Sequence, residues 1–235
     1  MENKLKETRN KKQETRKSPP WRTCPASAGG LGWVKKTNIR LNMQERIKQQ
    51  IKDSLELKEK LLESPALLAD IEKASLTILK AFRTNHKLML AGNGGSAADA
   101  QHLAAEFVSK FNFDRPGLPA LALTTDTSIL TSVGNDYSFL QVFARQISAL
   151  GNKGDVFIAI STSGRSPNLV EALKAAKVKE VMTIGMTGAS GGLMKDHCDI
   201  CIRVPSEETP RVQEAQILLG HIICSLVEEE LFSQK

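Results

Sequence analysis

The sequence lacks the features of several special classes of protein. No uninterrupted apolar run approaches the roughly 20 residues that a helix needs to cross a bilayer, so we expect no membrane-spanning segment. Cysteine is scarce, because the 235 residues include only four, too few and too scattered for a disulfide framework. A reducing, cytoplasmic setting fits best. Apolar residues at 41% and charged residues at 25% are typical of an ordinary globular protein.

Two of the cysteines, Cys198 and Cys201, have the CxxC spacing of redox and zinc sites. They lie in a run, residues 198–204, whose pattern predicts a strand. Residues three apart on a strand point to opposite faces. We therefore interpret the pair as buried small hydrophobic residues.

Positive charge is concentrated at the N-terminus. Residues 1–42 contain eleven Lys and Arg and three Glu, a net charge of +8, whereas the remaining 21 basic and 23 acidic residues give about −2. This segment has no sustained apolar period, so we expect a disordered basic leader, non-native or preceding an alternative start at Met43. It lacks the apolar centre of a secretory signal. We expect neither nucleic acid nor a membrane as its partner.

Apolar periodicity from residue 43 onward predicts an α/β protein. Residues 43–62 have the spacing of an amphipathic helix, and Ser64-Pro65 predicts the start of a second helix that ends near Asn85. Short apolar runs then alternate with helical patterns. We predict strands at 87–91, 119–123, 154–160, 180–185 and 198–204, and helices at 96–110, 127–149 with a break near Gly134, 166–178 and 209–232.

The predicted strands are apolar on both faces, as in the run Val-Phe-Ile-Ala-Ile at 156–160. This pattern is typical of a parallel sheet with helices on both sides. We expect a doubly wound α/β domain over residues 43–235, with a five-stranded parallel sheet sandwiched by helices. The two N-terminal helices could cover the sheet or form a subunit interface. Ligands of such sheets bind beyond the carboxyl ends of the strands.

Two polar turns fall at that edge of the predicted sheet. The turn Gly92-Asn93-Gly94-Gly95-Ser96 opens a helix, whose first N–H groups and dipole attract an anion. The turn Ser161-Thr162-Ser163-Gly164-Arg165-Ser166-Pro167 adds hydroxyl groups and a helix start capped by Ser166. An ordinary capped turn is the alternative for the second one. Together the turns predict a site for a phosphorylated small molecule.

A nucleotide cofactor is not expected at the first turn. Gly92-x-Gly94-x-x-Ala97 matches the loose dinucleotide pattern, but that pattern wants an acidic residue about 20 positions on. The first candidate, Asp126, is 34 positions beyond Gly92. No Gly-Lys-Ser/Thr follows, which excludes a P-loop.

The helix at 96–110 carries polar side chains beside the first turn. Asp99, His102 and Glu106 share a polar face, which alone is most simply a solvated surface. In the last helix, Gln213 and His221 are eight residues apart, about 80° around the axis, and could line one cleft. A hydrogen-bonded core histidine is the alternative for His221. The predicted buried stripe of the 96–110 helix consists of Ala100, Leu103, Ala104, Phe107 and Val108.

Five motifs follow one another between Met43 and the C-terminus. They are Gly92-Asn93-Gly94-Gly95-Ser96-Ala97-Ala98-Asp99, His102-x-x-x-Glu106, Gly134-Asn135-Asp136, Ser161-Thr162-Ser163-Gly164-Arg165-Ser166, and Gln213-Glu214 with His221. In this order and spacing they resemble the phosphoheptose isomerases of the sugar isomerase (SIS) domain family. Two features depart from that pattern: the basic leader, and Gln216, where many members have a second histidine.

The resemblance implies a homotetramer with shared active sites that interconverts sedoheptulose 7-phosphate and D-glycero-D-manno-heptose 7-phosphate for bacterial surface polysaccharides. It implies Glu106 and His221 as the acid–base pair, and one zinc ion per subunit held by His102, Glu106, Gln213 and His221. The residues implied to bind the seven-carbon sugar phosphate are Asn93, Gly94, Gly95, Ser96, Glu106, Asn135, Asp136, Ser161, Thr162, Ser163, Ser166 and Gln213.

Elementary chemistry fits this role. Moving a carbonyl group between neighbouring carbons through an enediol requires proton transfers of the kind that a carboxylate and a histidine perform. The alternative is a non-catalytic SIS-domain protein that binds a replication initiator or another protein. Relatives of that kind lack the helix carboxylate, so Glu106 together with His221 favours an enzyme. A sugar-phosphate-sensing regulator would need a DNA-binding domain, for which the sequence gives no sign.

Overall fold

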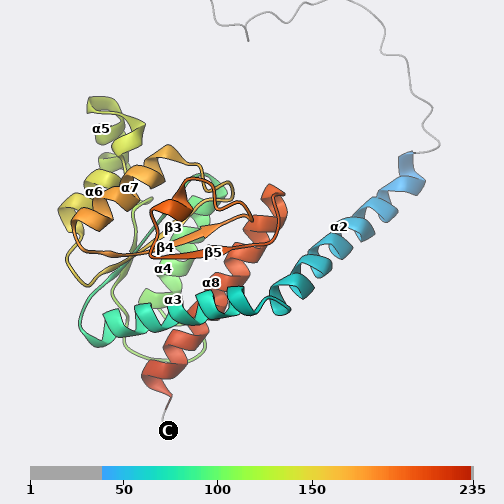
Figure 1. The fold of residues 1–235 in the computed structure, drawn as a ribbon, viewed down its shortest axis with the longest axis horizontal. Coiled ribbons are helices and arrows are strands. Elements are labelled where there is room, and N and C mark those ends of the chain that lie inside the picture. The colour runs from blue at the N-terminus through green and yellow to red at the C-terminus, as the bar shows by residue number, and fades with distance from the viewer. Residues whose placement is uncertain (1–38, 234–235) are drawn as a thin grey trace, which may run out of the picture. The chain divides into compact units, whose positions relative to one another are not determined.

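The computed structural model describes residues 39–233 (Figure 1). The predicted leader therefore lies outside the described residues as far as residue 38. The chain divides into two units, 1–45 and 46–235, and the second contains the sheet. Helix α2 (Ile39–Leu62) begins four residues before the predicted start at Met43. Residues 39–42 include neither Gly nor Pro, so nothing in them ends the helix.

Helix α3 (Pro65–Arg83) begins where the sequence predicts. Its N-cap residue Ser64 accepts a hydrogen bond from the N–H of Leu67 at 3.4 Å, and Pro65 occupies the first turn. The buried face of α3 joins the core beneath the sheet. The apolar face of α2 is different, because Ile47 is 53% exposed and Ile51 is 57% exposed. Of the two predicted helices, α3 thus covers the sheet and α2 leaves apolar side chains uncovered.

Five parallel strands form one sheet in the order β2-β1-β3-β4-β5, which confirms the predicted doubly wound fold. The register aligns Leu88 with both Ala120 and Val156. The strands are β1 (Leu88–Gly92), β2 (Ala120–Ala122), β3 (Val156–Ile160), β4 (Met182–Thr187) and β5 (Ile200–Arg203). The other elements are α4 (Gly95–Val108), α5 (Thr127–Asp136), η1 (Phe139–Gln141), α6 (Ala144–Leu150), α7 (Pro167–Val178), η2 (Met194–Asp196) and α8 (Thr209–Phe232).

Side chains of the strands alternate between two cores, one on each face of the sheet. Leu88 and Leu90 pack with α3, α4 and α8, whereas Met89 and Ala91 pack with α6 and α7 (Figure 1). Strand order reverses between β1 and β3, which are neighbours at the centre of the sheet. The two polar turns follow these two strands, so they lie together at the usual ligand-binding position of the fold.

The predicted break in the 127–149 helix is confirmed, because α5 ends at Asp136, two residues after Gly134. Two other local predictions are wrong. Val108 is 52% exposed, because it lies in the last turn of α4 beyond the core. The side chain of Ser166 makes no capping hydrogen bond, since its hydroxyl lies 3.0 Å from the hydroxyl of Ser161.

The two cysteines of the CxxC sequence do not point to opposite faces, which corrects another prediction. Strand β5 begins at Ile200, so Cys198 precedes the strand and its alternation does not apply. A hydrogen bond from Cys198 lowers the pKa of the Cys201 thiol to about 7 and raises the pKa of Cys198. Both thiols are only partly buried.

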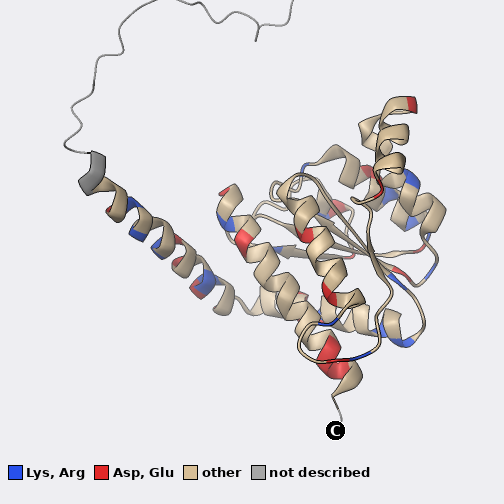
Figure 2. Ribbon diagram, turned by 180° about the vertical axis from the view of Figure 1, so that it is seen from behind, with Lys and Arg blue, Asp and Glu red and all other residues tan. Residues whose placement is uncertain are grey.

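Charged residues of both signs alternate along α2, whereas acidic residues gather at the C-terminal end of α8 (Figure 2). Glu228, Glu229 and Glu230 lie there, where the helix dipole disfavours negative charge. Glu229 and Glu230 are exposed to solvent, but Glu228 is 1% exposed. Within residues 39–233, no helix has both the length and the apolar character that a membrane crossing requires.

Asp155 connects the amino ends of β1 and β3. Its side chain is 2% exposed, accepts backbone N–H groups of Lys87 at 3.0 Å and Asn152 at 2.8 Å, and pairs with the Lys87 ammonium group. Burial alone would raise the pKa of Asp155, but the hydrogen bonds from Lys87 and Asn152 outweigh it and lower the pKa. The folded state therefore favours the ionised carboxylate.

We expect Asp155 to stabilise the fold at neutral pH and to lose this effect in acid. Because its folded pKa lies below the ordinary 3.8, its contribution is complete above pH 3.8 and disappears as the pH falls through the folded value. In urea denaturation at pH 7, the free energy of unfolding of Asp155→Asn should be about 3–5 kcal/mol below that of the wild type, which is the cost of breaking a buried ion pair. The difference should shrink below pH 3.8, and a pH-independent difference would contradict this account.

Candidate active site

Side chains from two helices converge on one point. His102 and Glu106 are one turn apart on α4, and His221 projects from α8. The His102 Nε2 atom lies 2.8 Å from Nε2 of His221 and 3.1 Å from Oε1 of Glu106. We call these three residues the triad. The fold thus brings the two residues of the predicted acid–base pair into one cluster, although His102 and His221 are 119 positions apart.

The triad has the donor set of a zinc site. Its two imidazole nitrogens and one carboxylate oxygen all lie within 4.8 Å of one another. Tetrahedral zinc, with bonds of about 2.0–2.2 Å, separates its ligand atoms by roughly 3.4 Å. Two of the three distances between these atoms, 2.8 and 3.1 Å, would need to widen by roughly 0.3 to 0.6 Å. The side chain of His102 is 50% exposed, so the cluster is open to solvent.

Close packing of α4 against α8 holds the triad together. A Cβ atom on Gly220 would lie 2.6 Å from the Cδ atoms of Leu103, so glycine at this position allows the close contact. The half-buried ring of His221 also packs against the ring of Phe111, with the two ring centroids 5.5 Å apart.

Gln213 meets the first turn of α4, two turns before His221 on α8. A Cβ atom on Gly95 would lie 2.1 Å from Gln213 Nε2, so the amide covers the backbone of the glycine turn. Gln213 also hydrogen-bonds to Asp99. Burial raises the pKa of Asp99, and the Gln213 bond and the charge of His102 offset this only in part. Among the described residues, the buried Oδ2 atom of Asp99 has no hydrogen-bond partner.

The two polar turns are joined by side-chain hydrogen bonds. The side-chain amides of Asn93 and Asn168 donate one hydrogen bond to each other, at 3.0 and 2.9 Å. These two hydrogen bonds fix the first turn to the start of α7. Gly94 has φ 58°, a left-handed conformation that favours glycine and directs the chain into α4. Asn93, Gly94, Gly95 and Ser96 thus lie beside the turn that contains Ser161, Thr162, Ser163 and Ser166.

Two of the predicted site residues stay apart from the triad within one chain. Asn135 and Asp136 are exposed at the end of α5, where the Asn135 amide donates to Asp136 at 2.9 Å. Figure 1 places α5 with α6 and α7, away from α8. Among residues 39–233, neither side chain bonds to the triad or to the polar turns.

Sequence reasoning missed Asn168 and an ion pair between Arg115 and Glu228. Asn168 is 75 positions from its partner Asn93, and Glu228 is 113 positions from Arg115, so no local pattern in the sequence signals either pair. Gln216, which was expected to depart from the family pattern, is 1% exposed and donates to the carbonyl of Met186 at 2.8 Å. It fixes α8 to β4 and makes no hydrogen bond to the triad.

Comparisons with known proteins test the predicted family. Residues 49–188 match the SIS domain. The chain is 58% identical to phosphoheptose isomerase 2 of Campylobacter jejuni over 193 residues, which cover 82% of this chain and 96% of that protein. It is 55% identical to the phosphoheptose isomerase of Aneurinibacillus thermoaerophilus, over 82% of this chain and 98% of the relative.

The chain belongs to the phosphoheptose isomerase family. The family predicted from the five motifs is thereby confirmed. Solved phosphoheptose isomerases share the fold. The enzyme from Neisseria gonorrhoeae superposes with a TM-score of 0.74 at 40% identity, over 80% of this chain and 99% of that chain. The one from Francisella tularensis superposes with a TM-score of 0.76 at 34% identity, over 80% and 98%.

We expect Gly95→Ala to disable the candidate active site, at the contact between Gly95 and Gln213, without weakening the fold. Alanine favours a helix by about 1 kcal/mol over glycine, so the melting temperature should not fall. The new Cβ would displace the Gln213 amide, and a misplacement of about 1 Å can cost roughly 10²-fold in isomerase turnover.

A double-mutant cycle isolates the cause. In a Gln213→Ala background, Gly95→Ala should have little further effect on turnover, because the displaced amide is already absent. A full additional loss in that background would show that the added Cβ acts elsewhere.

Proposed function

We propose that this chain interconverts sedoheptulose 7-phosphate and D-glycero-D-manno-heptose 7-phosphate. The observation that carries the proposal is the triad, in which a carboxylate and two imidazoles meet beside a pair of polar turns. The names of the relatives point to the same reaction. Such an isomerase would act in the cytoplasm and supply heptose for bacterial surface polysaccharides.

The polar turns are suited to the phosphate group. The glycine turn lies at the start of α4, where the positive end of the helix dipole attracts an anion. Ser161, Ser163 and Ser166 add hydroxyl donors. From Gly95 to His102 the helix rises about 10 Å, comparable with the length of an extended seven-carbon chain. A sugar with its phosphate at the turn could therefore present C1 and C2 to the triad.

The reaction needs two proton movements. In our proposal the Glu106 carboxylate takes a proton from C1 of the ketose and returns it to C2, through an enediol. His221 moves the second proton from the C1 oxygen to the C2 oxygen, so that atoms and charge balance. Positioned proton transfer of this kind contributes roughly 10²–10⁴ to a rate.

The same residues would hold zinc. His102, Glu106 and His221 supply the nitrogen and oxygen donors that zinc prefers. Gln213 would complete the set, since its partner Asp99 precedes His102 by one turn of α4. Zinc bound there supplies a Lewis acid that polarises the carbonyl group.

A homotetramer with shared active sites would explain two features of the single chain. Exposed apolar side chains, including Leu62, Leu68 and Leu226, line a groove of about 330 Å³ that a second subunit could cover. Asn135 and Asp136 stay apart from the triad within one chain, and a neighbouring subunit could bring its own copies to the sugar. Both features support the proposed assembly.

We expect the wild-type chain to convert sedoheptulose 7-phosphate into the aldose, detected by NMR, and Glu106→Gln to lose at least 10²-fold in turnover. The amide keeps the shape of the side chain but cannot accept the carbon-bound proton. Sugar-phosphate binding should survive in the variant. Absence of aldose with the wild type would reject the function, and normal turnover by the variant would reject the role of Glu106.

Removal of metal gives a separate prediction. Dialysis against a chelator should lower turnover, and added zinc should restore it, because the metal polarises the carbonyl group. His102→Ala should weaken zinc binding, measured by competition with a chelating dye, whereas Thr77→Ala, in a helix surface remote from the triad, should not. Full turnover in metal-free protein would remove zinc from the mechanism and leave the proton-transfer pair intact.

A further inference from the structure

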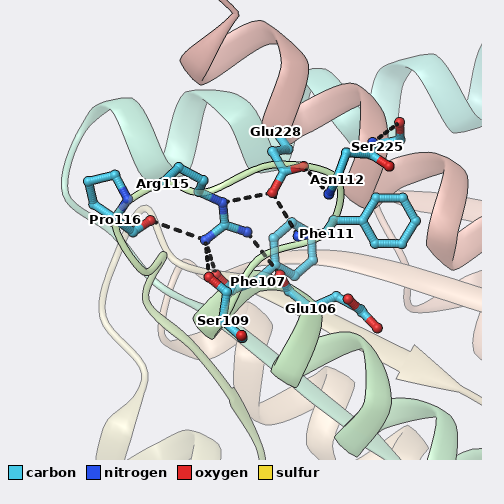
Figure 3. A network of polar contacts seen from close by, with 9 residues as sticks. All are labelled: Glu106, Phe107, Ser109, Phe111, Asn112, Arg115, Pro116, Ser225 and Glu228. Atoms are coloured by element: carbon cyan, nitrogen blue, oxygen red, sulfur yellow. Dashed lines mark hydrogen bonds and ion pairs between the residues drawn. The ribbon is translucent and has the colours of Figure 1, made fainter.

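Arg115 caps the C-terminal end of α4 from the loop that follows this helix. Figure 3 shows its guanidinium group among four backbone carbonyls and one carboxylate. Arg115 donates to the carbonyls of Glu106 at 2.9 Å and Phe107 at 2.6 Å, which belong to the last turn of the helix. The remaining carbonyl bonds, to Ser109 and Pro116, are 3.2 and 3.1 Å long. The cation thereby neutralises carbonyls that a helix end leaves unpaired.

Glu228 joins the same loop to α8. Its Oε1 atom accepts from Arg115 Nε at 2.9 Å and from the N–H of Phe111 at 2.8 Å. Its Oε2 atom accepts the N–H of Asn112 at 2.6 Å (Figure 3). Burial alone would raise the pKa of Glu228, but these N–H groups and Arg115 lower it below 4.5. The folded state therefore favours the ionised carboxylate, and both of its oxygen atoms accept hydrogen bonds.

The ion pair connects directly to the triad on both helices. On α4, Arg115 binds the backbone carbonyl of Glu106, whose side chain belongs to the triad. On α8, Glu228 lies seven residues after His221, two turns along nearly the same face. Between them, Glu228 holds the backbone of Phe111, and the Phe111 ring packs on His221.

Stability alone does not account for such a pair. The side chains of Arg115 and Glu228 are 2% and 1% exposed, so both charges are removed from water. Desolvation offsets much of the attraction, and apolar replacements of buried ion pairs are often as stable or more stable. Arg115 donates to five oxygen atoms and Glu228 accepts from three nitrogen atoms, and so many directed bonds define one geometry between α4 and α8.

We propose that Arg115 and Glu228 are positioning residues for the triad: they fix α4 against α8 and hold Phe111 on the ring of His221. The inference rests on the proposed isomerase function for its effect on turnover. Arg115→Lys keeps the charge but cannot bind several carbonyls in one plane. Glu228→Gln keeps the shape but turns one acceptor into a donor facing backbone N–H groups.

The test compares these variants with Asp155→Asn, which breaks a second buried ion pair at the amino ends of the strands, outside the site. We expect all three variants to lose stability. Arg115→Lys and Glu228→Gln should also lower kcat by roughly 10–100-fold at temperatures where they stay folded, as changes behind metal ligands do. Asp155→Asn should keep the wild-type kcat.

NMR spectra of protein labelled with ¹³C in histidine give a readout that depends on neither turnover nor metal. The chain has four histidines, at positions 86, 102, 197 and 221. The two positioning variants should shift the ring signals of His102 and His221 and leave His197 unchanged. Asp155→Asn should move at most His86, which adjoins Lys87. A wild type without isomerase activity would reject the proposed function, while these spectra would still test the positioning.

Phe111→Leu covers the case in which the charge variants fail to fold. It keeps the backbone N–H that donates to Glu228 and removes the ring that contacts His221 and packs at the edge of the core. We expect a shifted His221 signal and a lower kcat, measured at temperatures where the variant stays folded. Wild-type His221 signals and kcat in folded Arg115→Lys or Glu228→Gln, or in Phe111→Leu, would overturn the proposal and leave the ion pair a purely structural element.

Discussion

The contact between α4 and α8 is the constraint on which the site depends. Because Gly220 has no side chain, Leu103 can pack directly against it, and any larger residue at position 220 would prevent this contact. The two helices therefore lie close together and contact each other at two levels. At the first level Gln213 meets Gly95 and Asp99, and at the second His221 meets His102. In the proposed function, this one helix pair would provide an anion site at its start and a proton-transfer cluster two turns further on.

The sheet determines where this helix pair begins. Because strand order reverses between β1 and β3, the turns after these strands lie together, and their donors face the same space. The Asn93–Asn168 amide pair then fixes the first turn to α7. In the proposed function, binding and chemistry would thus follow from separate parts of the fold: the carboxyl edge of the sheet would hold the anion, and the packing of two helices on one face forms the triad.

Much of this could be predicted from local patterns. The strands alternate between two cores and the helices have a clear period, so their order and the positions of both turns followed from residues such as Val156 and Ser64. Residues that bond over long separations gave no such signal. No local pattern distinguishes the buried pair of Arg115 and Glu228 from ordinary surface charges, and Cys198 was assigned to a strand that begins two residues later. Asn135 and Asp136 were predicted beside the sugar, and one chain alone cannot test that placement.

Isomerisation of sedoheptulose 7-phosphate in D₂O, with the aldose examined by NMR, tests the central claim most directly. If Glu106 carries a proton between C1 and C2 in a site open to solvent, deuterium should enter the product at C2. The Glu106→Gln chain should yield neither aldose nor labelled sugar. Aldose formed by the wild type with no deuterium at C2 would mean that the hydrogen passes between the carbons without exchange, and would contradict a proton carried by Glu106 in a site open to solvent.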